Sequence, residues 1–241
     1  MIPCCYVFRY DDPEKREKAL KRLYCSIESI KNQTDEIYVI DASENPIEVP
    51  ICVNIINHPQ TGTFNKSQIL NYGVKHYLSD YIWCILADAD IIFEPDYVKK
   101  MEAYTHGEPV RVTGYSQSAY HEFYTSDYNE AMRLINDRGV TAWRSGEAPG
   151  IGLLHIPSFL KIRGFNEKFR EYSCEDTELN RRLAYINKYI YDPTIKNVHL
   201  FHEPNAANFT NENNEIYYES ERLFQSGNLA RNDPDTWDSY E

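Results

Sequence analysis

Two aspartates, Asp88 and Asp90, stand directly after a short apolar run at residues 81–87. A run of this length, bounded by polar residues, indicates a strand buried on both faces of a parallel sheet. Ligands of open α/β sheets bind outside the carboxyl ends of such strands. Two carboxylates at that edge therefore predict a bound divalent cation. A second D-x-D sequence, at Asp233 and Asp235, lies in a polar stretch and carries no such expectation.

Two histidines, His199 and His202, lie in a short apolar segment late in the chain. Imidazole nitrogens combined with carboxylate oxygens suit Mn²⁺ and similar borderline ions better than the all-oxygen sites of Mg²⁺. In a regular strand the two side chains would point to opposite faces, so joint ligation of one ion requires an irregular turn between them. Without the aspartates, two ordinary surface or core histidines would be the better interpretation.

Two further clusters have both a structural and a functional interpretation. Glu175 and Asp176 begin an amphipathic segment, where acidic side chains commonly complement the helix dipole. Alternatively, Asp176 projects from a fixed helix end and acts as a general base. Near Phe64 and Lys66, the sequence is compatible with an ordinary helix start. It is equally compatible with a functional role, in which Lys66 binds a phosphate and the Phe64 ring stacks on a base.

The composition narrows the class of partner. The chain has 241 residues, 42% of them hydrophobic and 26% charged, and a formal net charge of −12. Nucleic acids and anionic membranes repel such a surface, so neither is expected as the principal partner. A phosphate-containing ligand would need a local cation, either a metal ion or a few placed Lys and Arg side chains.

The sequence also bears on location and redox state. No stretch approaches the roughly 18 to 20 apolar residues of a membrane span, and no signal peptide is evident. The six cysteines show neither C-x-x-C spacing nor a loop-rich framework, so reduced thiols are expected. A cytoplasmic protein is the simplest expectation, with peripheral membrane association as the alternative.

The elements that must position these residues alternate along the first hundred residues. Strands are predicted at 4–8, 36–40, 51–56 and 81–87, with helices that start near residues 13, 63 and 95. This pattern predicts a doubly wound, Rossmann-like half with a mostly parallel sheet. Right-handed crossovers would place Arg9, Asp41 and the two aspartates at 88 and 90 along one edge. The chain lacks both G-x-G-x-x-G and Walker sequences, so no dinucleotide fingerprint is present.

Beyond residue 110 the pattern is less regular. Strands are predicted at 110–115, 150–156 and 198–202, and helices at 129–136, 157–162 and 175–184. We expect a single α/β domain. It comprises a nucleotide-binding half at about 1–105, an acceptor and catalytic half at about 106–205, and a polar C-terminal tail at 206–241.

Five motifs in this order resemble the GT-A glycosyltransferases. They are FNKSQILNYG (64–73), LADADII (86–92), the segment 150–165 that ends in Arg-Gly-Phe, EDTELNRRL (175–183) and VHLFH (198–202). The nearest patterns are the β-1,4-galactosyltransferase catalytic domain and the chondroitin-polymerase type. The resemblance extends from about residue 4 to 205 and implies the GT-A fold.

The resemblance also implies a role for each matching position. It implies metal ligation by Asp90, His202 and His199, with Asp88 near the metal or the donor ribose; the galactosyltransferase pattern has a methionine where this chain has His199. Nucleotide contacts are implied for Arg9, Asp41, Phe64 and Lys66. Asp176 matches the catalytic base, with Glu175 beside it binding the acceptor. Tyr172 matches a gating tryptophan, and Cys174 replaces a glycine, so the sugar specificity and loop motion of the family do not transfer directly.

The implied activity is metal-dependent, inverting transfer of a hexose or N-acetylhexosamine from a UDP-sugar to a saccharide or glycoconjugate hydroxyl, as in polysaccharide biosynthesis. Mn²⁺ is the expected ion, with Mg²⁺ as the alternative. A retaining GT-A transferase and a catalytically silent sugar-nucleotide-binding module are the competing interpretations. Ile92 stands where a D-x-D-x-T phosphatase requires threonine, and Asp88 and Asp90 are too close for the opposed carboxylates of a glycosidase.

Overall fold

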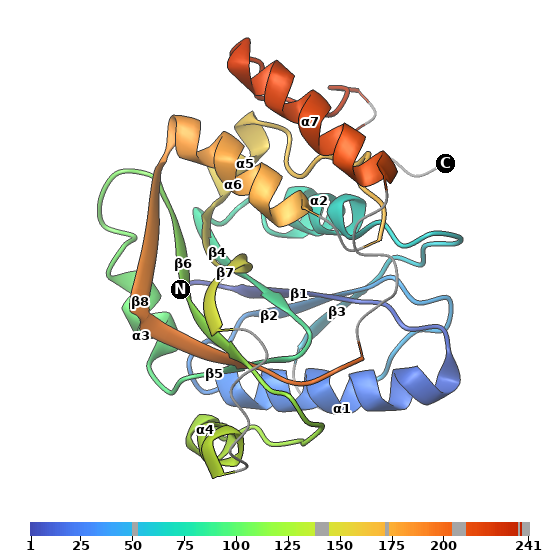
Figure 1. Cartoon of the computed structure of the whole chain (residues 1–241), viewed down its shortest axis with the longest axis vertical. Helices are drawn as coiled ribbons and strands as arrows, with labels where there is room; N and C mark the ends of the chain where they lie inside the picture. Colours follow the sequence, from blue (N-terminus) through green and yellow to red (C-terminus); the bar gives the residue numbers. More distant parts are fainter. Residues whose placement is uncertain (50–52, 138–144, 172–173, 204–210, 236, 238–241) are drawn as a thin grey trace.

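The computed structural model describes residues 1–49, 53–137, 145–171, 174–203, 211–235 and 237. Within these residues, one eight-stranded sheet runs through the molecule in the order β3-β2-β1-β4-β7-β6-β8-β5 (Figure 1). The strands are β1 (Cys4–Phe8), β2 (Ile37–Asp41), β3 (Asn54–Asn57), β4 (Trp83–Asp88), β5 (Ile91–Phe93), β6 (Val110–Ser118), β7 (Ser145–His155) and β8 (Lys188–His199). The helices are α1 (Pro13–Ile30), α2 (Lys66–Tyr77), α3 (Tyr97–Glu102), α4 (Tyr128–Asp137), α5 (Ile156–Lys161), α6 (Glu175–Ile186) and α7 (Asn211–Gln225).

The two halves of the sheet differ in strand direction. β3, β2, β1 and β4 run parallel, so their carboxyl ends meet at one edge. β7 is antiparallel to both β4 and β6, while β8 is parallel to β6 and antiparallel to β5. The Rossmann-like half and the mostly parallel α/β sheet predicted from the sequence are confirmed.

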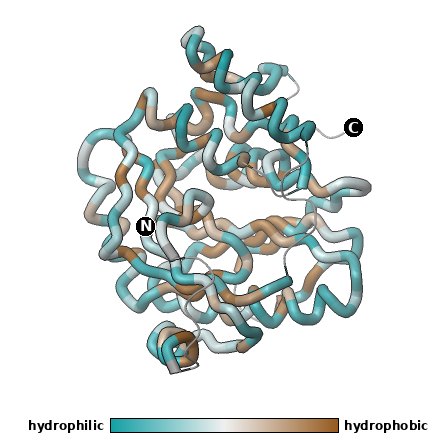
Figure 2. Tube along the Cα trace, viewed as in Figure 1, coloured by the Kyte–Doolittle hydropathy of each residue, from teal (hydrophilic) through white to brown (hydrophobic). Residues whose placement is uncertain are grey.

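The central strand β4 is buried on both faces, as its apolar run predicts. Ile85 and Ala87 join the core beneath α1, whereas Cys84 and Leu86 join a second core with α2, α5 and α6. Figure 1 shows α1 on one side of the sheet and those three helices on the other. Figure 2 shows the matching concentration of hydrophobic residues along the central strands. Each fully buried aliphatic side chain contributes about 1.5–3 kcal/mol, so β4 is firmly fixed and can present Asp88 rigidly.

Helix α1 begins where the sequence predicts. The side chain of Asp12 accepts hydrogen bonds from the backbone N–H groups of Glu14 and Lys15 at 3.0 and 3.1 Å, and Pro13 occupies the first helical position. Such a cap is worth about 1 kcal/mol. The apolar face of α1, which includes Leu23 and Ile27, packs on the sheet.

Three elements differ from the sequence expectation. The three-residue strand β5 follows the D-x-D sequence immediately. Strand β8 starts at Lys188 and ends at His199, so His202 lies beyond it. The segment expected as a polar tail contains helix α7, which packs against α6. Its buried residues are polar, Asn213 and Ser220.

Two further properties concern the chemistry and surroundings of the chain. The five described cysteines are free thiols, and Cys52 lies outside the described residues. Among the helices in the described part of the chain, none combines the length and the apolar character needed to cross a membrane.

Candidate active site

The side chains of Asp90, His199 and His202 converge. His199 Nε2 lies 3.4 Å from Asp90 Oδ1, and His202 Nε2 lies 3.4 Å from Asp90 Oδ2. One ligand atom from each of the three side chains lies within 4.8 Å of the others. The two histidines reach one point because β8 ends at His199 and the chain then turns irregularly, which removes the strict alternation of a strand.

Strand pairing explains how residues so distant in sequence meet. Strand β5 pairs antiparallel with β8, and Ile91 lies opposite His199. The N–H of Leu200 then donates to the carbonyl of Asp90 at 2.8 Å. The turn between β4 and β5 is thereby fixed against the segment after β8, and the two histidines lie on either side of the Asp90 carboxylate.

This group fits a divalent cation. Asp90 Oδ1 is buried and has no hydrogen-bond partner among the described residues, although a buried carboxylate oxygen normally has one. Two imidazole nitrogens and one carboxylate form a ligand set that suits Mn²⁺. The sequence predicts these ligands, and their geometry is compatible with one shared ion.

A second cluster surrounds Lys66 at the start of α2. Its Nζ lies 2.9 Å from Asp88 Oδ1, 3.3 Å from Asp176 Oδ2 and 3.6 Å from Glu175 Oε1. Burial by itself lowers the pKa of Lys66, but the three carboxylates outweigh it and raise that pKa well above its ordinary value. Lys66 is therefore a buried, protonated link between the D-x-D strand and helix α6.

Asp88 differs from Asp90 in its surroundings. Its side chain is 34% exposed, and it faces Lys66 rather than the histidines at short range. Burial favours its neutral form, but the charge of Lys66, followed by His199 and His202, lowers the pKa of Asp88. Asp88 thus stays ionised between the lysine and the three candidate metal ligands.

Asp176 lies in the first turn of α6 and meets strand β7 at Gly150. A β-carbon at Gly150 would lie 2.5 Å from Asp176 Oδ2, so only glycine leaves room for this carboxylate. The Asp176 side chain is 18% exposed, whereas that of its neighbour Glu175 is only 3% exposed. Asp176 is consequently the more accessible of the two acids.

A buried arginine, which no sequence motif singles out, ties helix α6 to the strand that carries Gly150. Arg111 in β6 donates to Asn180 Oδ1 at 2.9 Å and to the Pro149 carbonyl at 2.7 Å. Asn180, on α6, donates to the same carbonyl at 2.8 Å. These bonds fasten α6 to the residue that precedes Gly150. The sequence does hint at this role, because Arg111 stands between two valines in a predicted apolar strand.

The motif at 64–73 contacts the segment that precedes α6. Asn71 accepts from the Phe165 N–H at 2.8 Å and donates to the Phe165 carbonyl at 3.0 Å. Gly164, which directly precedes Phe165, has a φ of 63°, and a β-carbon at this residue would collide with the Asn71 side chain. The Arg-Gly-Phe sequence therefore forms a turn that is hydrogen-bonded to helix α2 through Asn71. Farther along, the carbonyl of Phe64 accepts from the Glu171 N–H at 2.8 Å.

The residues expected around the nucleotide occupy two different environments. Arg9, at the end of β1, donates to the Gly62 carbonyl at 2.7 Å, and its guanidinium lies 5.9 Å from the centre of the Phe64 ring. Asp41, at the end of β2, is 1% exposed. Its two oxygens accept from the backbone N–H groups of Ser43 and Ile47. Arg9 and Phe64 therefore lie together, while Asp41 shapes the loop after β2. Tyr172 lies outside the described residues.

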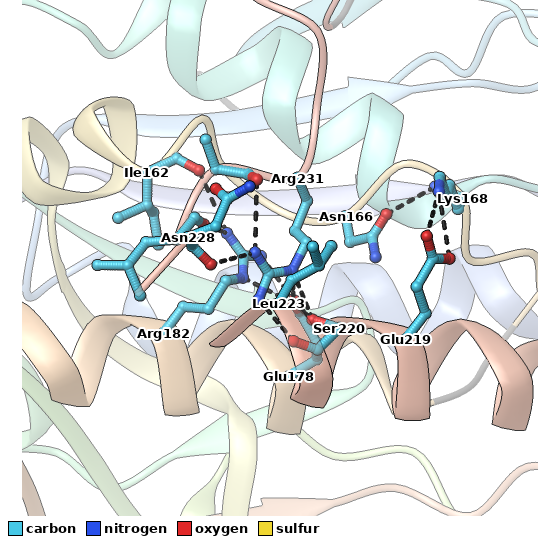
Figure 3. A network of polar contacts seen from close by, with 12 residues as sticks. Ile162, Asn166, Lys168, Glu178, Arg182, Glu219, Ser220, Leu223, Asn228 and Arg231 are labelled. Carbon is cyan, nitrogen blue, oxygen red and sulfur yellow. Dashed lines mark hydrogen bonds and ion pairs between the residues drawn. The ribbon is translucent and has the colours of Figure 1, made fainter. Parts of the chain in front are cut away.

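A buried ion network fixes α6 from its other side (Figure 3). Arg182 makes two hydrogen bonds to Glu178, at 2.7 and 2.6 Å. Arg231, beyond α7, lies 3.3 Å from the same carboxylate and donates to Ser220 Oγ at 2.6 Å. The side chains of Glu178, Arg182 and Arg231 are at most 2% exposed. The C-terminal segment is thereby attached to the helix that carries Asp176.

Comparisons with known proteins address the fold. No family model matches the sequence, and no curated protein matches it either. Similar solved structures include the catalytic domain of Drosophila β-1,4-galactosyltransferase 7 in complex with xylobiose, which is 12% identical with a TM-score of 0.52 and matches 90% of this chain and 80% of that one. GalNAc-T7 with UDP, GalNAc and Mn²⁺ is 11% identical with a TM-score of 0.64, over 94% of this chain and 49% of that one.

A third similar structure, a putative glucose-1-phosphate thymidylyltransferase from Bacillus anthracis in complex with sucrose, is 12% identical with a TM-score of 0.51. It matches 80% of this chain and 87% of that one. This chain spans about half the length of GalNAc-T7 but most of the length of the other two. The identities are low, so the likeness concerns the backbone. The sheet order, the D-x-D strand and these similarities agree: the chain has a GT-A-like glycosyltransferase fold.

Proposed function

We propose that this chain is a metal-dependent glycosyltransferase that moves a hexose or N-acetylhexosamine from a UDP-sugar to a hydroxyl of a saccharide or glycoconjugate. The observation that carries the proposal is the convergence of Asp90, His199 and His202 on one point at the edge of a GT-A-like sheet. Two similar structures support it, because one contains UDP, GalNAc and Mn²⁺ and another contains manganese, UDP-Gal and xylobiose.

The proposed metal ligands are Asp90, His199 and His202, with Asp88 alongside. When bound, Mn²⁺ (or Mg²⁺, as the alternative) supplies Lewis-acid charge that neutralises the leaving nucleoside diphosphate. This would also allow an acidic chain to hold a phosphate compound.

The nucleotide is proposed to lie over the carboxyl ends of β1 and β4. Phe64 offers a ring face to the base beside Arg9, and Lys66 offers a protonated amine beside Asp88. The Asp41 carboxylate already accepts two hydrogen bonds from the backbone of the loop that follows β2. We therefore propose that Asp41 supports the uridine pocket through the backbone of that loop.

The proposed reaction is a single displacement with Asp176 as the general base. Asp176 removes the proton of the acceptor hydroxyl, whose oxygen forms a bond to the anomeric carbon while the bond from that carbon to the diphosphate oxygen breaks. Attack from the opposite face inverts the anomeric configuration. Glu175 is buried and faces Lys66. We therefore propose that Glu175 positions Lys66 and contacts the acceptor beside Asp176.

The first test separates binding from chemistry. A panel of nucleotide sugars is screened by thermal shift with and without Mn²⁺, and the sugar that stabilises the protein is then offered with saccharide acceptors. Transfer with an inverted anomeric centre, read by NMR, is expected. Retention of configuration would replace the displacement by a retaining mechanism. Stabilisation with neither transfer nor donor hydrolysis would indicate a silent binding module.

The second test assigns the residues. Asp176→Asn is expected to keep nucleotide and Mn²⁺ binding while transfer falls by roughly 10²-fold or more. Asp90→Ala is expected to abolish Mn²⁺-dependent UDP binding. Asp235→Ala is the matched control for Asp90→Ala, because Asp235 holds the same place in the second D-x-D sequence and is exposed. Normal turnover by Asp176→Asn would remove that residue from the mechanism, and undiminished binding by Asp90→Ala would relocate the metal.

A further inference from the structure

A pocket of about 300 Å³ lies between helix α1 and the segment that follows β8. The α1 side of this pocket carries Lys15, Lys18 and Arg22, and the other side carries His202. His202 is also one of the two histidines that face the Asp90 carboxylate. The pocket therefore adjoins the candidate metal site and presents several cations next to it.

The cation that stands out is Arg22. It is 5% exposed, yet in the described part of the chain no carboxylate forms an ion pair with it. Glu122, the nearby acid, pairs with Lys18 at 3.4 Å. A hydrogen bond from Tyr124 and the charge of Lys18 lower the pKa of Glu122, and the charge of Arg22 adds to this without an ion pair. Burying a guanidinium without a paired anion is costly, so this charge is best explained by an anion that enters the pocket.

The three remaining acids of the pocket, Asp12, Glu14 and Glu203, form no ion pair with Arg22 in the described part of the chain. The Asp12 carboxylate is engaged as the cap of α1. Glu14 and Glu203 are exposed, where water screens their charges. The deep end of the pocket therefore keeps a positive charge while its rim is mixed.

Tyr10 connects this end of the pocket with the metal site. Tyr10, Arg22 and His202 all line this one pocket. Burial raises the pKa of Tyr10, and the negative charge of Asp90 raises it further, while Arg22 opposes both. Because Arg22 and His202 line the same pocket and His202 faces Asp90, an anion held by Arg22 would lie near the candidate metal site.

We infer that this pocket binds a phosphate group beside the metal site, with the Arg22 guanidinium as its principal counter-charge and the Tyr10 hydroxyl as a second donor. The planar guanidinium matches two phosphate oxygens at once. The inference rests on the proposed function for the identity of the compound, a nucleoside diphosphate. Free pyrophosphate shares the chemistry, so the test compares the two.

The experiment is calorimetric titration of the full chain with UDP, uridine, pyrophosphate and Mn²⁺ alone. Arg22→Met is expected to weaken UDP binding in the presence of Mn²⁺ by about tenfold or more, with Mn²⁺ alone and uridine unaffected. Lys21→Met is the matched control. Lys21 is the adjacent residue of α1, is exposed and pairs with Glu17, so its removal subtracts the same charge away from the pocket.

The outcomes divide clearly. A loss confined to UDP supports the nucleotide as the source of the phosphate, and a loss for pyrophosphate as well supports a general phosphate site. Unchanged affinity of Arg22→Met for both compounds, or an equal loss in Lys21→Met, overturns the inference. Arg22-dependent pyrophosphate binding without sugar transfer from any donor would refute the proposed function and leave the phosphate site intact.

Stability provides the second readout. Met is similar in length and carries no charge, so metal-free Arg22→Met is expected to have a Tm no lower than the wild type. Arg22→Lys keeps the charge but loses the bidentate geometry, and is expected to restore part of the UDP affinity. A marked drop in the Tm of Arg22→Met with unchanged phosphate affinity would make Arg22 a structural residue and overturn the assignment.

Discussion

Gly150 in β7 lies directly against the carboxylate of Asp176 in α6, with room for a hydrogen but not for a β-carbon, which would lie 2.5 Å from Asp176 Oδ2. The contact joins a strand fixed by two neighbouring strands to the helix end that carries the proposed base. Because Arg111 and Asn180 both bond to the preceding carbonyl, that of Pro149, the strand cannot easily withdraw. The position of Asp176 therefore depends on this glycine.

Gly150→Ala is expected to displace the Asp176 carboxylate and to reduce kcat by roughly 10²-fold, since a misplacement of about 1 Å can have that effect. The affinity for UDP with Mn²⁺ should change little. Gly107→Ala is the control, because a β-carbon at Gly107 meets nothing within 4 Å. Steady-state kinetics and calorimetry measure the two quantities. A normal kcat in Gly150→Ala would show that the placement of Asp176 does not limit the reaction.

The metal site gives a prediction about stability that needs no substrate. Mn²⁺ at about 100 times its Kd should stabilise the wild type by about 2.7 kcal/mol. Asp90→Asn should lose that gain, yet be at least as stable as the wild type without metal, because it removes a buried carboxylate whose Oδ1 lacks a hydrogen-bond partner in the described residues. Urea unfolding with and without Mn²⁺ measures both effects. Equal stabilisation of Asp90→Asn and the wild type by Mn²⁺ would place the ion elsewhere.

The sequence predicts the buried strand before Asp88 and the start of α1 at Pro13 well, because apolar runs and helix caps are local signals. It does not reveal β5, because three residues are too few for periodicity to register. That strand pairs with β8 and brings Asp90 to His199, so the sequence supplies the ligands of the metal site but not the pairing that assembles them.

Other parts of the site escape prediction because they depend on long-range packing. Arg111 and Asn180 meet across a sheet–helix contact, and nothing in their local sequence names the partner. The residues that helix α7 buries most deeply are polar, such as Ser220, so its contact with α6 does not follow from apolar spacing alone. For Asp41 the sequence predicts a contact that the structure does not favour. Its place at the end of β2 predicts a nucleotide contact, but its carboxylate accepts hydrogen bonds from the backbone N–H groups of Ser43 and Ile47 in the following loop.

Lys66 should make stability depend on acid pH. Lys66→Met leaves Asp88, Glu175 and Asp176 without their shared cation, and breaking such a buried cluster typically costs about 3–5 kcal/mol at neutral pH. The pKa of Asp88 is lowered in the folded state, so its stabilising effect is present above the ordinary value of 3.8 and is lost as the pH falls through the folded value.

The difference in free energy of unfolding between the wild type and Lys66→Met is therefore expected to be largest near neutral pH and to shrink below pH 3.8 as Asp88 becomes protonated. Urea titrations of metal-free protein at several pH values measure it. Lys75→Met is the control on the same helix, because Lys75 lies over the Trp237 ring, outside this cluster. A difference that stays constant down to the lowest pH would show that Lys66 acts through packing rather than charge.

The attachment of the C-terminal segment can be tested with two ion pairs of Figure 3 that differ in burial. Glu178→Gln leaves Arg182 and Arg231 buried without a full counter-charge, and a loss of about 3–5 kcal/mol in unfolding free energy is expected. Glu219→Gln breaks the pair with Lys168, whose side chains are 46% and 56% exposed, and is expected to cost no more than about 1 kcal/mol. Urea unfolding of both variants gives the comparison.

The same comparison shows whether this network also serves the reaction. Glu178 lies two residues after Asp176 on α6, so a loosened Glu178 should let the base move, and kcat should fall in Glu178→Gln while UDP affinity holds. Glu219 lies on α7, whose outer face can lose a charge without moving α6, so Glu219→Gln should retain its kcat. If Glu178→Gln unfolds more easily but turns over at the wild-type rate, the C-terminal segment stabilises the fold without positioning Asp176. If both variants lose activity equally, α7 itself takes part in binding the acceptor.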